Sequence, residues 1–109
     1  MKQYAVFLTD DAKTDLLDLY DYIAEHDALA KADGVLEKLE ALVESLSRFP
    51  ERGAVTKELR DVGIKDYREV YFKPYRVIYR VLGAKVYVYL IVDGRRDMQT
   101  LLTQRLIRA

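Results

Sequence analysis

The sequence predicts an α+β fold in which a helical hairpin packs on a mostly antiparallel sheet, with the element order β-α-α-β-β-β-α. Apolar residues recur at helical spacing through most of the first half of the chain, whereas the second half alternates with the period of strands. Short turn sequences separate the segments, and no linker or repeat interrupts them. With 109 residues, half of them hydrophobic, the chain is expected to form one domain over residues 1–109.

The first half is expected to contain one strand and two helices. The apolar and aromatic run at 3–8 predicts a strand, and Thr9, followed by two aspartates, is typical of a helix N-cap. The first helix then ends near residue 25, and a second helix runs from 29 to about 47. Such a brief connection predicts an antiparallel hairpin, and Gly34 is expected to mark close packing between its helices.

The second half reads as a meander followed by a short helix. "FPERG" at 49–53 breaks the helical pattern, and tight turns are expected at 73–74 and 83–84. The segments with strand character are 55–59, as a possible short strand, then 66–72, 75–82 and 85–92. After a turn at Asp93-Gly94, Asp97 is expected to cap a final helix whose apolar residues are Met98, Leu101, Leu102 and Leu106.

Composition and charge exclude several classes of protein. The chain has no cysteine, no stretch of 18 apolar residues and no signal-peptide pattern, so we expect a cytoplasmic protein without disulfides or membrane spans. The net charge is zero, but residues 1–54 carry 6 basic and 12 acidic side chains, whereas residues 55–109 carry 12 and 6. This division predicts a basic face built from the second half, which suits nucleic acid, an acidic protein segment or intramolecular pairing.

The usual catalytic and cofactor motifs are missing. His26, the only histidine, falls between the predicted helices and is interpreted as a surface residue. Asp11, Asp15 and Asp18 share one side of the first helix and are interpreted as a solvated face. No glycine-rich loop suits a phosphate, so we predict neither a metal nor a cofactor.

Arginine and tyrosine are the remaining candidates for function. Strand alternation over 75–82 places Arg76 and Arg80 on one face, where they either meet phosphates or an acidic partner, or pair with carboxylates such as Glu58, Glu69 or Asp97. Arginines can also stabilise charge during RNA cleavage if a proton-transfer group lies nearby. After Val92, however, the chain contains no Tyr, His, Lys or Glu.

The element order, "FPERG", "YRVIYRV", "VYVYLIVDGRRD" and the leucine-bearing tail together resemble the toxins of the RelE/ParE superfamily of type II toxin–antitoxin systems. The acidic first helix and the "RRD" ending resemble the ParE, or plasmid-stabilisation, branch. RelE-type members are ribosome-dependent mRNA endonucleases that often use a C-terminal Tyr or His, whereas ParE-type members poison DNA gyrase. Since this chain lacks that Tyr or His, the resemblance implies a non-enzymatic gyrase inhibitor.

The resemblance also implies partners: DNA gyrase as target, and a cognate ParD-like antitoxin that wraps the toxin in a hetero-oligomer. Partner contact is predicted for Arg68, Arg76, Arg80, Arg95, Arg96, Met98, Leu101 and Leu102. The final helix either docks on the sheet or gives up its place to a partner. One alternative is an mRNA endonuclease that uses Arg68, Arg76, Arg80 and Arg95, with Tyr79 or Tyr89 as proton donor. Another is a non-toxic module that only binds its antitoxin.

Overall fold

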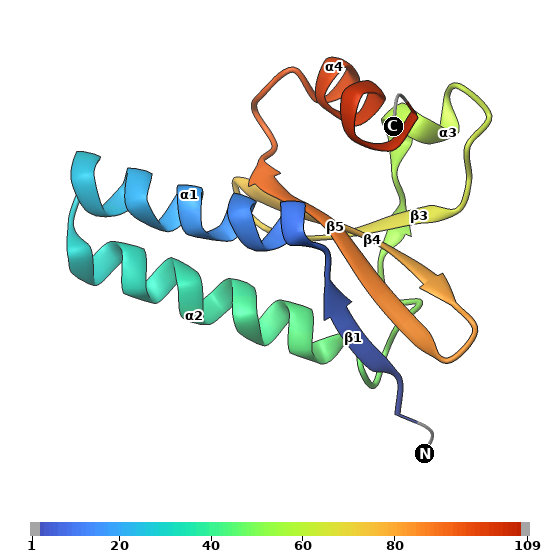
Figure 1. Ribbon diagram of the computed structural model, residues 1–109, viewed down its shortest axis with the longest axis horizontal. Helices are drawn as coiled ribbons and strands as arrows, with labels where there is room; N and C mark the ends of the chain where they lie inside the picture. The colour runs from blue at the N-terminus through green and yellow to red at the C-terminus, as the bar shows by residue number, and fades with distance from the viewer. Residues whose placement is uncertain (1–2, 108–109) are drawn as a thin grey trace.

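A computed structural model describes residues 3–107 and has the predicted α+β architecture. Five strands form one sheet in the order β1-β5-β4-β3-β2, with β1 parallel to β5 and every other pair antiparallel (Figure 1). The strands are β1 (Ala5–Leu8), β2 (Ala54–Val55), β3 (Tyr67–Phe72), β4 (Tyr75–Leu82) and β5 (Lys85–Asp93). The meander of β3, β4 and β5 therefore lies where the alternation pattern predicted it.

The two long helices, α1 (Asp10–His26) and α2 (Leu29–Ser45), form the expected antiparallel hairpin against the sheet (Figure 1). Thr9 caps α1, because its hydroxyl accepts a hydrogen bond from the backbone N–H of Ala12 at 3.1 Å. The prediction that Gly34 marks close helix packing is wrong. A Cβ at Gly34 would meet nothing within 4 Å, so the glycine faces open space.

The segment after α2 differs from the prediction of a strand over 55–59. Only Ala54–Val55 pair with β3, and Lys57–Arg60 form a helical turn, α3. This turn buries Leu59 completely, in the smaller core that also contains Met98 and Leu102 of the final helix. The final helix is α4 (Met98–Leu102), continued by a π-helical turn η1 (Thr103–Ile107). Asp97 caps it as predicted, accepting from the backbone N–H of Thr100 at 3.2 Å.

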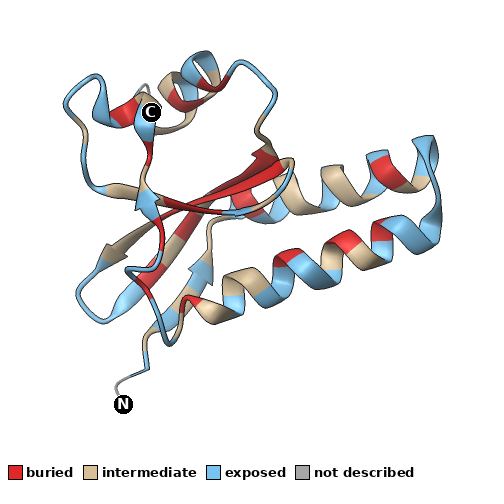
Figure 2. Cartoon of the chain, turned by 180° about the vertical axis from the view of Figure 1, so that it is seen from behind, coloured by how far each residue is buried: buried red, intermediate tan, exposed pale blue. Residues whose placement is uncertain are grey.

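The sheet has an apolar core on each face, and its central strands β4 and β5 are the most buried part of the chain (Figure 2). On the face of the hairpin, the sheet residues Val77, Tyr79, Val86 and Val88 pack against α1 and α2. On the opposite face, a smaller core brings α3 and α4 against β4 and β5. Its buried members are Leu59, Ile78, Leu90, Val92, Met98 and Leu102. A register shift between β4 and β5 at Ile78/Tyr79 switches the alternation of β5, so that Val86 and Val88 belong to the core under the hairpin whereas Leu90 and Val92 belong to the smaller core.

Candidate partner-binding site

The turn that follows β5 is packed tightly onto the strand beside it. The backbone N–H of Gly94 donates to the carbonyl of Pro74 at 2.8 Å. A Cβ at Gly94 would lie 2.5 Å from Cδ of Arg76 and 3.1 Å from the Pro74 carbonyl oxygen, so only glycine fits without a shift. The Asp93-Gly94 turn predicted from the sequence is confirmed, and it rests on the aliphatic stem of a buried arginine.

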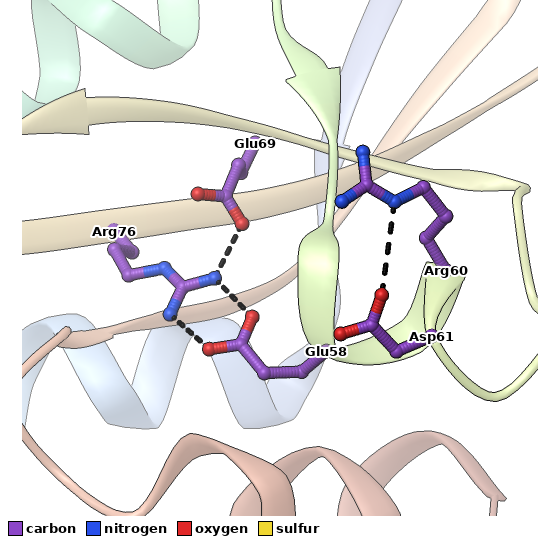
Figure 3. Close-up of polar contacts among 5 residues, drawn as sticks. All are labelled: Glu58, Arg60, Asp61, Glu69 and Arg76. Carbon is purple, nitrogen blue, oxygen red and sulfur yellow. Dashed lines mark hydrogen bonds and ion pairs between the residues drawn. The ribbon is translucent and has the colours of Figure 1, made fainter.

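Beneath this turn, Arg76 lies in a buried ion cluster (Figure 3). Its guanidinium donates to both carboxylate oxygens of Glu58, at 2.9 and 2.8 Å, and to Glu69 at 2.5 Å. The Arg76 side chain is only 10% exposed and that of Glu69 only 3%. The alternative that Arg76 pairs with carboxylates is thus confirmed for Glu58 and Glu69. Asp97 does not take part, because its carboxylate bonds the backbone N–H and hydroxyl of Thr100.

The electrostatics of the cluster follow from this pairing. Hydrogen bonds from Arg76 lower the pKa of Glu58, and the same contacts raise the pKa of Arg76, so the guanidinium stays charged. A hydrogen bond to Glu69 raises the pKa of Tyr71, whose ring is exposed at the rim. Within the described chain, Nε of Arg76 has no partner. The cluster fixes its charges in place and leaves no free guanidinium edge facing solvent.

Two further predicted arginines of the sheet also have internal partners. Arg68 donates to the carbonyl oxygen of Gly53 at 2.8 Å and so ties β3 to the segment before β2. Arg80 lies 3.9 Å from a carboxylate oxygen of Asp66 and over the ring of Tyr67, with its side chain 35% exposed. Arg68 therefore serves the fold, whereas Arg80 keeps part of its charge at the surface.

Arg95 and Arg96, in contrast, project from the turn into solvent. Nη2 of Arg95 lies 2.6 Å from a carboxylate oxygen of Asp93, and the Arg95 side chain is 76% exposed. Hydrogen bonds from Arg95 lower the pKa of Asp93. The exposed Arg96 side chain makes neither an ion pair nor a hydrogen bond to any residue in 3–107. These two cations are the predicted site residues most available to a partner.

A groove of about 370 Å³ connects the two arginines to the first helix. Its lining mixes apolar and charged side chains and consists of Asp15, Asp18, Leu19, Tyr22, Ile91, Val92, Asp93, Arg95 and Arg96. Of the apolar residues predicted to meet a partner, Met98 and Leu102 are buried in the smaller core, and Leu101 is half-buried. The final helix is therefore docked on the sheet, one of the two expected arrangements.

Asp15 is a structural residue that sequence reasoning missed. The interpretation of Asp11, Asp15 and Asp18 as one solvated face is wrong for Asp15, whose side chain is 9% exposed. Its carboxylate accepts a hydrogen bond from the backbone N–H of Ile91 at 3.2 Å and forms an ion pair with Arg105. Because Arg105 follows ninety residues later, on η1, only the folded topology brings the pair together.

His26 lies at the surface, as expected, stacked on Tyr22 with its Nδ1 3.0 Å from the carbonyl oxygen of that residue. Over residues 3–107, no group of three or more His, Cys, Asp or Glu side chains is arranged to hold a metal ion. The helices in the same part of the chain are too short or too polar to cross a membrane.

Comparison with known proteins gives a consistent result for family and fold. Residues 6–98 match the family described as the ParE toxin of the type II toxin–antitoxin system parDE. A chain from the chromosomal ParDE system of P. aeruginosa is similar, with a TM-score of 0.70 at 19% identity, covering 85% of this chain and 98% of that one. Comparison with curated protein sequences gives no match.

Two other solved structures share the fold. A chain of a RelBE toxin–antitoxin complex from Mycobacterium tuberculosis has a TM-score of 0.62 at 20% identity, covering 84% of this chain and 98% of that one. A mutant of the E. coli toxin RelE in the free state has a TM-score of 0.65 at 14% identity, covering 97% and 96%. Since the family match spans residues 6–98, this chain belongs to the ParE toxin family of type II toxin–antitoxin systems.

Proposed function

We propose that this ParE-type toxin inhibits DNA gyrase by binding to it, and so blocks DNA replication, and that a ParD-like antitoxin neutralises it by direct binding. The family supports a toxin of this branch. The buried Arg76 cluster is the observation that supports inhibition by binding and not by catalysis. In it, the guanidinium of Arg76 already donates hydrogen bonds to two carboxylates. The whole of residues 1–109 is proposed to act as one toxin domain.

RNA cleavage would need a cation free to meet the scissile phosphate and a proton-transfer group beside it. A phosphate approaching Arg76 would have to displace Glu58 and Glu69, whose negative charges also repel it. Of the two candidate proton donors, Tyr79 is fully buried on the hairpin face, away from Arg76 and Arg80. Burial raises the pKa of Tyr79 and of Tyr89, which makes either phenol a poorer acid–base group near neutral pH.

The predicted contact residues divide by accessibility. Arg80, Arg95, Arg96 and Leu101 are at least partly exposed and are proposed to contact the antitoxin or gyrase. Arg68 and Arg76 are proposed to support this surface from below through their bonds to other parts of the fold. Met98 and Leu102 can reach a partner only if α4 leaves the sheet, because both side chains belong to the smaller core. An acidic antitoxin segment would suit the exposed cations.

Inducible expression with two parallel readouts tests the proposal. We expect growth arrest with induction of the DNA damage response and no new 5′ ends in translated messages. Co-expression of a cognate ParD-like antitoxin should restore growth. New cuts within translated messages, without a damage response, would favour the endonuclease alternative. Harmless expression of a folded protein would favour the non-toxic antitoxin-binding alternative.

A further inference from the structure

A row of aromatic side chains with one arginine crosses the sheet near the β4–β5 turn, which lies away from α3 and α4 (Figure 1). The strand registers align one residue from each of four neighbouring strands: Tyr67, Arg80, Tyr87 and Phe7. The row lies on the face opposite the helical hairpin, because the strand neighbours Val6, Val86 and Val88 pack under the hairpin. With strands about 4.8 Å apart, these four residues span roughly 14 Å.

The rings of this row contact one another. Phe7 and Tyr87 are stacked with their centroids 5.5 Å apart, and Tyr67 meets Tyr89 edge-to-face, also at 5.5 Å. The pKa of Tyr89 is raised first by burial, and Tyr67, Tyr87 and Arg80 also act on it electrostatically, so these side chains lie close together. Phe7 remains 44% exposed in spite of its stack. The aromatic row, Phe7, Tyr87, Arg80 and Tyr67 with Tyr89, therefore keeps ring surface available for a further planar group.

The aromatic row also carries positive charge. The guanidinium carbon of Arg80 lies 5.8 Å from the ring centroid of Tyr67, within the range of a cation–π contact. Its carboxylate partner, Asp66, is 3.9 Å away and 65% exposed, so this ion pair holds the guanidinium weakly. Lys85 precedes Tyr87 by two positions and thus shares its face. Lys85 is exposed and has no ion pair or hydrogen bond with another side chain in residues 3–107.

Packing explains only part of this arrangement. Tyr67 and Tyr89 border the smaller core, and a tyrosine in that position needs no further purpose. Core packing does not explain why Phe7 stacks at the surface or why a loosely held arginine stands among the rings. Rings on a sheet with a cation between them are what single-stranded nucleic acids require, because bases stack on aromatic side chains while cations meet the phosphates.

We propose that the aromatic row is a binding surface for single-stranded nucleic acid. One base continues the stack of Phe7 on Tyr87, and Arg80, with Lys85 beside it, meets the phosphates. The surface lies roughly 20 Å along β5 from the Arg95–Arg96 turn, and Arg80 is its only member among the arginines proposed to contact a protein partner. It does not use the buried Arg76 cluster, involves no cleavage, and does not depend on gyrase being the target.

The test measures fluorescence anisotropy of labelled oligonucleotides titrated with the purified full chain. The probes are single-stranded oligothymidylate and oligouridylate of about ten nucleotides, and a blunt DNA duplex of the same length. We expect both single strands to bind more tightly than the duplex, whose bases are already stacked on each other. Tighter binding of oligouridylate than of oligothymidylate would identify RNA as the preferred form of the ligand, and the reverse would identify DNA.

Two substitutions probe the rings and the charge separately. Phe7→Leu removes one ring and should weaken single-strand binding about tenfold, whereas Phe49→Leu, the same change at a phenylalanine that is 54% exposed elsewhere, should not. Arg80→Gln should weaken binding and reduce the slope of log K against log salt by about 0.7, the loss of one phosphate contact. Arg80→Lys should keep that slope, and Lys38→Gln on α2 is the control for net charge. Thermal unfolding by circular dichroism confirms that each variant is folded.

Several results would overturn the proposal. One is the absence of single-strand binding by the folded protein. Another is duplex binding as tight as that of the single strands, which would reduce the effect to attraction between opposite charges. A third is a loss of affinity in Phe49→Leu or Lys38→Gln as large as in Phe7→Leu or Arg80→Gln, since the aromatic row would then play no particular part. None of these results bears on gyrase inhibition, so the two proposals can fail separately.

Discussion

The Arg76 cluster and the Arg95–Arg96 turn contain the same kind of side chain, lie next to each other, and differ in almost every physical respect. Arg76 is buried and shared between two carboxylates, whereas Arg95 has one carboxylate partner and is largely in water. A buried charge that loses its partner is costly, but an exposed one is not. The difference teaches that the buried Arg76 serves stability below the surface, whereas Arg95 and Arg96 at the turn remain accessible to a partner.

The largest expected effect comes from breaking the buried side of the comparison. Arg76→Met should lower the free energy of unfolding by about 3 kcal/mol, because Glu69 is left buried without its cation. Urea unfolding followed by circular dichroism measures the change. Arg80→Met is the matched control on the same strand, and its half-exposed side chain should matter far less. Equal losses in the two variants would contradict the assigned difference in role.

The contact between the two regions is tested at Gly94. Gly94→Ala should destabilise the protein by about 2 kcal/mol, because the added Cβ must push aside the stem of Arg76 or the Pro74 carbonyl. Gly34→Ala is the control with the opposite sign, since its Cβ meets open space within a helix and should stabilise by about 0.5–1 kcal/mol. Thermal unfolding of both variants gives the comparison, and a neutral Gly94→Ala would mean that the turn does not rest on Arg76.

The pH dependence of stability separates the regions further. The pKa of Glu58 is lowered in the fold, so its contribution is fully present above its ordinary value of 4.5 and is lost as pH falls through the lower folded value. Glu58→Gln should therefore lower the free energy of unfolding by about 1 kcal/mol near neutral pH, a modest value because the Glu58 side chain is partly exposed to solvent. In strong acid the same substitution should change the free energy of unfolding little. Urea midpoints as a function of pH give this difference. A difference that persists unchanged in strong acid would assign the effect to packing instead of charge.

Salt sharpens the same contrast. Asp93 also has a lowered pKa, but its partner Arg95 is exposed, so about 1 M salt should screen their interaction more than that of the Arg76 cluster. Asp93→Asn removes the contribution of Asp93 to the pH dependence of stability, and this contribution should be smaller in high salt. The contribution that Glu58→Gln removes should be largely the same in high salt. Equal salt sensitivity in the two variants would show that the Arg76 cluster is as well solvated as the turn.

The smallest expected effect on stability is at the turn itself. Arg95→Ala/Arg96→Ala should leave the unfolding midpoint close to that of the unmodified protein, because both side chains lie in solvent. The same variant should bind the antitoxin more weakly, with most of the change in the association rate and its salt dependence. Surface plasmon resonance with the immobilised antitoxin measures this. A large drop in thermal stability would assign the pair a structural role.

The sequence predicted the fold well because periodicity is a local property. The alternation in β4 and β5 and the spacing of apolar residues in α1 and α2 depend on neighbours within a few positions, and the structure has these elements within about two residues of the predicted bounds. The exception is the segment 55–59. Lys57–Arg60 turn helical because Leu59 packs under α4, a contact made some forty positions along the chain.

The site was harder to predict because charge pairing depends on topology. Alternation alone put Arg76 and Arg80 on one face, yet Glu58 and Glu69 reach only the first of them with good geometry. Asp15 looked solvated beside Asp11 and Asp18 until the fold placed Arg105 and the Ile91 amide next to it. Gly94, in contrast, carried a usable signal, since a glycine directly after a strand-ending aspartate indicates a tight approach of backbone.

The proposed gyrase inhibition is tested most directly by a supercoiling assay with purified components. Gyrase, ATP and relaxed plasmid are incubated with the toxin in excess, alone or after mixing with its antitoxin. We predict that the toxin alone blocks supercoiling and traps cleaved plasmid, that Arg76→Met does so in proportion to its folded fraction, and that the antitoxin restores supercoiling. Normal supercoiling with no trapped cleavage, by a toxin shown to be folded, would contradict gyrase as the target.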